Sequence, residues 1–188
     1  GAGSGKTTFS RWLIRQYAQV LFTKEKTISI EDIHMGPIRI PILIRIGEFS
    51  EWLETHSTSN LLDYIGHQTW FGQKYTDDEF YILKDFVRYG HALIILDGLD
   101  EISTMDFHSR ILILVKNFIQ SYCKSHELIS PFDNALIATE EFENDFRCEG
   151  LFGGNLILIT SRILNYKIHP LKSELIVHYT IQPMNDKY

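Results

Sequence analysis

Cysteine is scarce in this chain, whose 188 residues include only Cys123 and Cys148. The spacing of the two fits neither a zinc motif nor a redox motif, which excludes a disulfide-rich secreted domain and a zinc finger. We therefore expect a reduced compartment, and so a cytoplasmic location. Long apolar runs are missing as well. The runs present, such as residues 92–96, are too short to cross a bilayer, so no membrane span is expected.

An excess of positive charge is also lacking. The chain has 18 Lys and Arg against 24 Asp and Glu, a formal net charge of −6. No general basic field attracts nucleic acid or an acidic membrane surface, so neither is an expected partner. The eight histidines are scattered. Cys123 and His126 supply only half of a zinc-ligand set, so a surface or structural role is the favoured interpretation for both.

The remaining composition is that of a globular domain. Hydrophobic residues make up 44% and charged residues 22% of a chain long enough to bury one sizeable core. Apolar spacing predicts helices at 7–22, 60–71, 76–89 and 106–122. Apolar runs predict strands at 38–46, 92–96, 155–160 and 174–181, with a polar loop at 24–36 and an insertion at 124–154. Strands that alternate with helices predict an α/β fold with a mainly parallel sheet.

The chain opens with GAGSGKTT, which matches the end of the phosphate-loop pattern G-x-x-x-x-G-K-[ST] if the leading glycine lies one residue before the first. Such a turn directs backbone N–H groups and a helix dipole at phosphate oxygens. Lys6 would contact the β- and γ-phosphates, and the Thr7 hydroxyl would bind Mg²⁺. The alternative is a flexible glycine linker. The candidate nucleotide-binding residues are Gly1, Ala2, Gly3, Ser4, Gly5, Lys6, Thr7 and Thr8.

A second candidate motif is ALIILDGLDEI, residues 92–102. Its apolar strand ends at Asp97, which is placed to hold Mg²⁺ from across the site. Gly98 leaves room beside the metal, and Asp100 and Glu101 follow in the turn, where either could orient or deprotonate an attacking water. The alternative is an ordinary acidic turn after a strand. A phosphate loop some ninety residues upstream favours the functional interpretation.

A third candidate motif is LILITSR, residues 156–162. Thr160, Ser161 and Arg162 follow an apolar strand, where a parallel sheet presents its ligand crevice. Arg162 could contact the γ-phosphate or stabilise charge that develops there. The alternative is a surface arginine at the end of a strand.

These three motifs, in this order and spacing, resemble the NACHT domain of the STAND signalling ATPases found in NOD-like receptors. The small residue after the first aspartate, followed by LDE, is typical of that family, and RIPILIRIGEF (39–49) is similar to its second strand. The resemblance covers nearly the whole chain and implies a P-loop NTPase three-layer sandwich. It implies phosphate-loop roles for Lys6 and Thr7, and a magnesium aspartate at Asp97. It also makes Asp100 and Glu101 the hydrolytic acids and Arg162 the first sensor.

The resemblance also implies that residues 1–188 form a fragment running from the phosphate loop to the fifth strand. The first glycine and the strand before it are missing, as are the helical and winged-helix subdomains. In this fold the missing strand is central, between the strands predicted at 155–160 and 174–181. We therefore expect residues 1–188 alone not to form a stable nucleotide-binding monomer.

The expected function is that of a regulatory switch that binds ATP or ADP with Mg²⁺ and hydrolyses ATP slowly. Its ATP state would self-associate, with effector and sensor domains outside these residues and an innate-immune role usual for the family. No Asn/Thr-Lys-x-Asp stretch is present to read guanine, which favours adenine weakly. Two alternatives stay open: a nucleotide-binding scaffold without hydrolysis, and a P-loop phosphotransferase, for which no acceptor motif is found.

Overall fold

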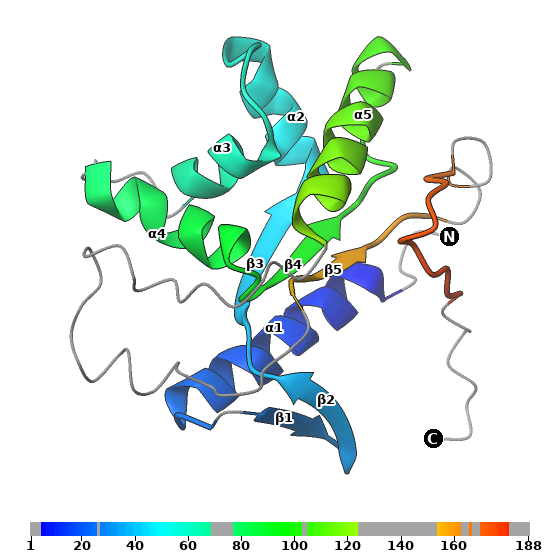
Figure 1. The fold of residues 1–188 in the computed structure, drawn as a ribbon. Helices are drawn as coiled ribbons and strands as arrows, with labels where there is room; N and C mark the ends of the chain where they lie inside the picture. Colours follow the sequence, from blue (N-terminus) through cyan, green and yellow to red (C-terminus); the bar gives the residue numbers. More distant parts are fainter. Residues whose placement is uncertain are drawn as a thin grey trace.

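The computed structural model describes residues 5–25, 27–68, 77–102, 105–123, 154–162, 166 and 170–180, with the backbone alone at 77–80 and 105–106. Within these ranges the chain forms five helices and five strands (Figure 1). The helices are α1 (Lys6–Phe22), α2 (Ile46–Thr55), α3 (Leu61–His67), α4 (Asp77–Arg88) and α5 (Met105–Tyr122). The strands are β1 (Thr27–Ile30), β2 (Ile33–Pro37), β3 (Ile40–Arg45), β4 (Ala92–Asp97) and β5 (Leu156–Ile159).

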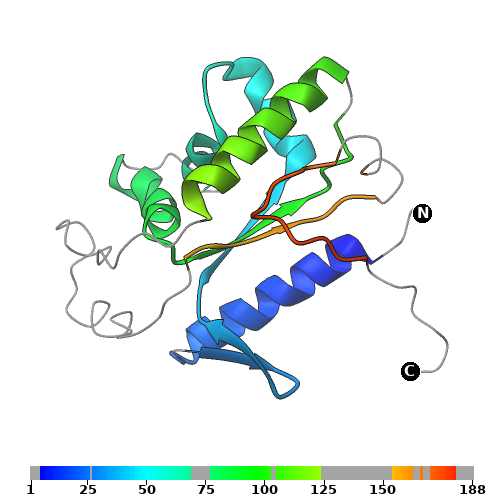
Figure 2. The ribbon, with the colours of Figure 1, turned by 45° about the vertical axis from the view of Figure 1, so that its right-hand side comes forward.

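A three-stranded parallel sheet forms the centre of the molecule, in the order β3-β4-β5. Its register pairs Arg45 with Asp97 and Leu96 with Ile159, so the carboxyl ends of all three strands lie at one edge. Helix α1 covers one face, and the helices α2 to α5 lie on the other (Figures 1 and 2). The predicted α/β class with parallel strands is therefore confirmed for the described residues.

Two apolar cores fill the spaces on either side of this sheet. Every residue of β4 is buried, and its side chains alternate between the two faces. Leu93 and Ile95 pack with Leu13 and Tyr17 of α1, whereas Ile94 and its even-numbered neighbours join the larger core under α2 to α5. A strand buried on both faces reads as a continuous apolar run, which is why this one could be predicted from sequence.

The helices agree closely with their predicted spans. Helices α1 and α5 begin one residue before the predicted starts, at 7 and 106, and α4 lies within the predicted 76–89. Helix α3 ends at His67, earlier than the predicted 71, and begins after Asn60, whose side chain accepts hydrogen bonds from the Leu62 and Asp63 N–H groups. A capped start of this kind stabilises a helix of only seven residues.

The amino ends of the strands are held by structural contacts. Arg39, only 8% exposed, donates from Nε to the Gly154 carbonyl oxygen at 2.9 Å and from Nη1 to that of Pro37 at 3.1 Å. Burial lowers the pKa of His91, and the charge of Arg39 lowers it further. Gly90 ends α4 at a φ of +80°, and a Cβ atom there would lie 3.0 Å from the Gly154 Cα. This end of the sheet is therefore closely packed.

One prediction in the first half of the chain is wrong, and one helix was not predicted. Residues 27–37 form an antiparallel hairpin, β1 with β2, and not a polar loop. Ile28 of the hairpin is fully buried against α1, and Glu31 and Asp32 make the turn at positive φ. The strand predicted at 38–46 ends at Arg45, and an unpredicted helix, α2, follows at once. Its buried residues Phe49 and Leu53 are four apart, as on one helical face.

The strand predicted at 174–181 is also wrong for residues 174–180, which are not part of any strand. Val177 is 71% and Tyr179 90% exposed. A strand needs a neighbouring backbone with which to pair, and none of the described strands pairs with this segment. Its backbone hydrogen bond from Ile176 N–H to the Ser173 oxygen closes a local turn. Ile181 and the insertion predicted at 124–154, except Gly154, lie outside the described residues.

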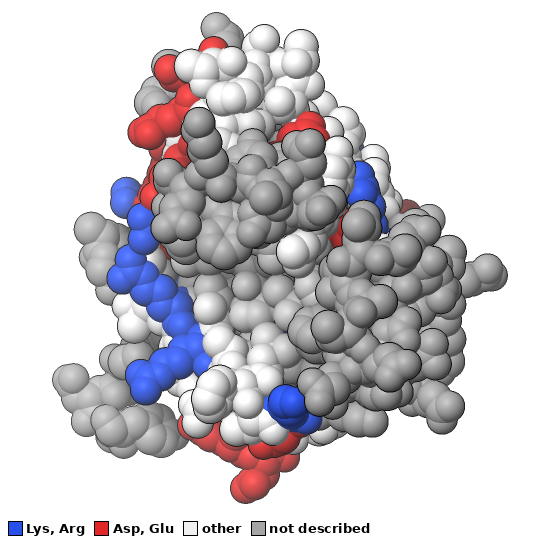
Figure 3. Space-filling model, turned by 90° about the vertical axis from the view of Figure 1, so that its left-hand side faces the viewer, with Lys and Arg blue, Asp and Glu red and all other residues white. Residues whose placement is uncertain are grey.

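The described helices include no membrane span, and the face drawn in Figure 3 is not broadly basic. None of the described helices combines the length and the apolar character needed to cross a bilayer. On the face drawn in Figure 3, most of the visible Lys and Arg form a narrow line along the left side, with smaller blue areas elsewhere, and most Asp and Glu gather towards the top and bottom. Charges of both signs therefore share this face.

Candidate functional site

Helix α1 begins at the carboxyl edge of the sheet. Gly5 precedes the helix at a φ of +75°, and its carbonyl oxygen accepts the Phe9 N–H at 2.8 Å. A left-handed residue at this point favours glycine and turns the chain into the helix. Lys6 is the first helical residue, followed by the exposed Thr7 and Thr8. Residues 1–4, the predicted first half of the phosphate loop, lie outside the described residues.

The Asp97 carboxylate lies beside the start of this helix. It ends β4, is 6% exposed, and accepts hydrogen bonds from three hydroxyl groups. The Thr7 hydroxyl donates to Oδ2 at 2.9 Å, the Thr160 hydroxyl to Oδ1 at 2.5 Å, and the Ser10 hydroxyl to Oδ1 at 3.5 Å. The structure therefore brings together the predicted residues Thr7 and Asp97, which are 90 positions apart in sequence.

The turn after β4 depends on Gly98. This residue has a φ of +80°, and a Cβ atom added to it would lie 2.8 Å from both Cδ and Oε2 of Glu101. The Glu101 N–H closes the turn by donating to the Gly98 carbonyl oxygen at 2.9 Å. Because glycine has no side chain, the Glu101 carboxylate can lie against the backbone of Gly98. The sequence predicted that glycine leaves room here, but assigned the room to a metal.

Gly98→Ala is expected to destabilise the fold by about 1–2 kcal/mol, because an L side chain at positive φ is strained. The new methyl group would also displace the Glu101 carboxylate. Chemical denaturation measures the first effect. Gly47→Ala is the matched control, since Gly47 lies within α2 with no atom within 4 Å of an added Cβ, and should be neutral or stabilising by up to about 1 kcal/mol. Equal stability of the two variants would contradict the prediction.

The residue that follows β5, Thr160, is hydrogen-bonded to the same turn. The Thr160 N–H donates to the Leu96 oxygen, the Leu99 N–H donates to the Thr160 oxygen, both at 2.9 Å, and the Gly98 N–H donates to the Thr160 hydroxyl at 3.1 Å. Thr160 thus holds both the Asp97 carboxylate and the backbone that follows it. From the sequence, Thr160 was expected at the ligand crevice, but no role was assigned to it. Ser10 was not predicted as a site residue, and the one sequence feature that could have indicated it is its position one helical turn after Thr7.

Arg162 and Asp100 form an ion pair next to this turn. The Arg162 Nε lies 3.1 Å from Asp100 Oδ2, and the Arg162 backbone N–H donates to Oδ1 at 2.8 Å. The Asp100 side chain is 2% exposed and that of Arg162 is 49% exposed. Of the predicted acids, Asp100 is therefore already paired, whereas Glu101 is exposed.

The geometry suits a divalent cation that keeps part of its water shell. No group of three or more His, Cys, Asp or Glu side chains suitable for a metal occurs among the described residues. Thr7 and Asp97 nevertheless place a hydroxyl oxygen and a carboxylate oxygen 2.9 Å apart at a helix start. Mg²⁺ is commonly held by one or two protein oxygens together with water and substrate phosphates. The residues present fit that ion.

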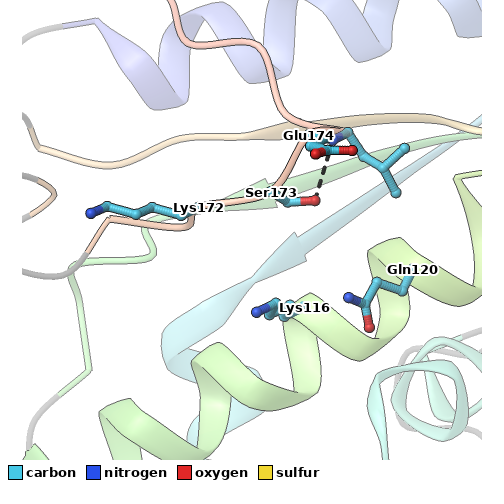
Figure 4. A pocket seen from close by; sticks show the side chains of 6 residues that line it. Lys116, Gln120, Lys172, Ser173 and Glu174 are labelled. Carbon is cyan, nitrogen blue, oxygen red and sulfur yellow. Dashed lines mark hydrogen bonds between the residues drawn. The ribbon is translucent and has the colours of Figure 1, made fainter.

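A separate open cavity of ≈ 520 Å³ lies between α5 and residues 172–175. Figure 4 shows Lys116 and Gln120 on the helix facing Lys172, Ser173 and Glu174 on the other segment. The Leu175 N–H donates to the Ser173 hydroxyl at 3.2 Å. None of the lining residues belongs to the motifs described above, so this cavity is not part of the candidate site.

The function of this chain is inferred from the geometry of the candidate site. The contacts that matter are those that join the start of α1, the end of β4 and the end of β5. No family model, curated protein or solved structure matches the chain.

Proposed function

We propose that the chain is a Mg²⁺-dependent ATP-binding domain of the NACHT type that hydrolyses its nucleotide slowly. The observation that carries this proposal is the 2.9 Å hydrogen bond between the Thr7 hydroxyl and the Asp97 carboxylate. A Gly-Lys-Thr sequence at a helix start and an aspartate at a strand end are each common. Their contact across 90 positions is what the P-loop NTPase architecture requires of a magnesium site.

The remaining residues fit roles in phosphate binding and hydrolysis. Lys6, at the first position of α1, would neutralise β- and γ-phosphate oxygens, and the helix N-terminus would add backbone N–H donors. The metal would supply charge neutralisation at the phosphates. Asp100 or Glu101 would orient and deprotonate the attacking water, and the half-exposed Arg162 would stabilise charge on the transferred phosphoryl group.

The biological role follows from the resemblance to STAND ATPases. Helices on both faces of a parallel sheet support the three-layer P-loop sandwich as the finer fold. The nucleotide would act as a latch between an ADP-bound and an ATP-bound shape, the latter self-associating through this domain. We place the protein in the cytoplasm, with effector and sensor domains outside these residues and an innate-immune type of signalling.

Two substitutions test the division of labour among the acids. Asp97→Asn is expected to reduce the Mg²⁺ dependence of ATP binding, because it removes the charged oxygens beside Thr7. Glu101→Gln should leave affinity within about twofold and slow turnover by roughly 10²-fold or more, the usual size of a general-base effect. Titration with a fluorescent ATP analogue, with and without Mg²⁺, measures binding, and phosphate release measures turnover.

The same assays separate the alternatives. Binding without phosphate release in the unmodified protein would favour a nucleotide-binding scaffold. Turnover that requires a small acceptor would favour a phosphotransferase. An affinity for Mg-ATP that Asp97→Asn leaves unchanged, together with the same affinity for ATP without Mg²⁺, would overturn the magnesium site itself.

A further inference from the structure

The two acids that follow Gly98 occupy different environments. Both carboxylate oxygens of Asp100 are engaged by Arg162, one by its backbone N–H at 2.8 Å and one by its Nε at 3.1 Å. With 2% of its side chain exposed, Asp100 offers no free face to water. Glu101 is exposed, and its carboxylate lies over the bare Cα of Gly98.

A general base must present an oxygen lone pair to the proton that it takes. Each Asp100 oxygen keeps a second lone pair, but with 2% of the side chain exposed it could meet a water only if the contact with Arg162 opened. Breaking an ion pair at a buried carboxylate is costly. The ion pair uses Nε and the backbone N–H of Arg162, so the two terminal Nη groups are not part of it. Asp100 is thus placed to fix the direction of Arg162 while its donor end stays available to an anion.

We propose that Asp100 is a positioning residue for Arg162 and that Glu101 is the carboxylate that activates the attacking water. This inference rests on the proposed ATP hydrolysis. The water oxygen bonds to the γ-phosphorus as the bond from that phosphorus to the β–γ bridging oxygen breaks, with its electron pair left on ADP. Glu101 takes the water proton and releases it to solvent, and Arg162, held by Asp100, contacts the phosphoryl oxygens.

A double-mutant cycle on turnover at saturating Mg-ATP tests the assignment. Arg162→Ala is expected to lower turnover about 100-fold, the usual cost of losing one transition-state contact. Asp100→Asn keeps the shape and loses the ion pair, and should cost roughly 10- to 100-fold through misplacement of Arg162. The double variant should be no slower than Arg162→Ala alone. If Asp100→Asn is as damaging in the Arg162→Ala background as in the wild type, Asp100 acts by itself and the proposal is wrong.

Glu101 supplies the matched control for this cycle. Glu101→Gln should slow turnover by the same factor with or without Arg162→Ala, because its action does not pass through the arginine. Arg162→Lys gives an independent test should Asp100→Asn fail to fold. It keeps the charge but has a single ammonium, which cannot pair with Asp100 and reach the phosphate together, so turnover should fall at least about tenfold. Turnover near the wild-type rate would overturn the proposal.

A measurement without nucleotide separates this inference from the proposed function. If the ion pair is present, the effects of Asp100→Asn and Arg162→Ala on thermal unfolding of the nucleotide-free protein should be non-additive. Absence of Mg-ATP binding by the full-length protein that contains these residues would defeat the proposed function while leaving this coupling measurable. Additive effects on unfolding would defeat the positioning role even in a protein that hydrolyses ATP.

Discussion

Replacing Lys6 by alanine is expected to weaken Mg-ATP binding about 10- to 150-fold, since a hydrogen bond to a charged group contributes about 1.5–3 kcal/mol. Lys6 is the first residue of α1, directly after the left-handed Gly5, at the end of the helix where the dipole is positive. A phosphate bound there would be neutralised by the ammonium group at short range. No other lysine lies in the three motifs.

Titration with a fluorescent ATP analogue in the presence of Mg²⁺ measures this loss. Arg15→Ala is the matched control, because Arg15 is an exposed cation of the same helix and its loss changes the net charge by the same amount. Its affinity should stay within about twofold of the wild type, as expected for a solvent-screened charge. An unchanged affinity in Lys6→Ala would remove the phosphate-loop assignment.

The core strands and the motifs beside them could be predicted because their signals are local. β4 is a continuous apolar run, since both of its faces are covered, and Asp97 is recognisable as the first charge after it. Gly-Lys-Thr is likewise a short sequence that predicts the start of a helix, and α1 begins at its lysine. In each case a few consecutive residues contain the whole signal, and the structure places them as expected.

The β1–β2 hairpin could not be predicted because its burial comes from elsewhere in the chain. Most of its residues are exposed or half-buried, and Ile28 is fully buried only because α1 lies against it. The 174–180 segment shows the opposite error. Its alternation of apolar residues is a strand pattern, yet strand formation also requires a partner backbone, and the described sheet ends at β5.

The pairing of Asp100 with Arg162 could not be predicted from the sequence, for a related reason. The two residues are 62 positions apart, and each belongs to a motif in which it has a role of its own. Only the parallel alignment of β4 and β5 brings the two turns together. The sequence left the choice between Asp100 and Glu101 open, and the difference in their exposure is what the three-dimensional arrangement adds.

Asn155→Ala is expected to lower the free energy of unfolding by about 3 kcal/mol, because it takes the Asn155 partner from the buried Ala92 N–H and removes one hydrogen bond each from the Val87 and Tyr122 oxygens. Asn155, 5% exposed, joins three elements through one side chain. Its Nδ2 donates to the Val87 oxygen at 2.6 Å and to the Tyr122 oxygen at 2.9 Å, and its Oδ1 accepts the Ala92 N–H at 2.9 Å. It thus holds the last turns of α4 and α5 to the start of β4.

The measurement is thermal unfolding, in which a loss of about 3 kcal/mol lowers Tm by roughly 6–12 °C for a chain of this size. Asn117→Ala is the control, because Asn117 is exposed on α5 and alanine favours the helix, so its Tm should be unchanged or slightly raised. Asn155→Asp should fail to rescue, since a carboxylate can accept from Ala92 but has no N–H for the two carbonyl oxygens. Wild-type stability in Asn155→Ala would show that α4, α5 and β4 are held together by their apolar contacts alone.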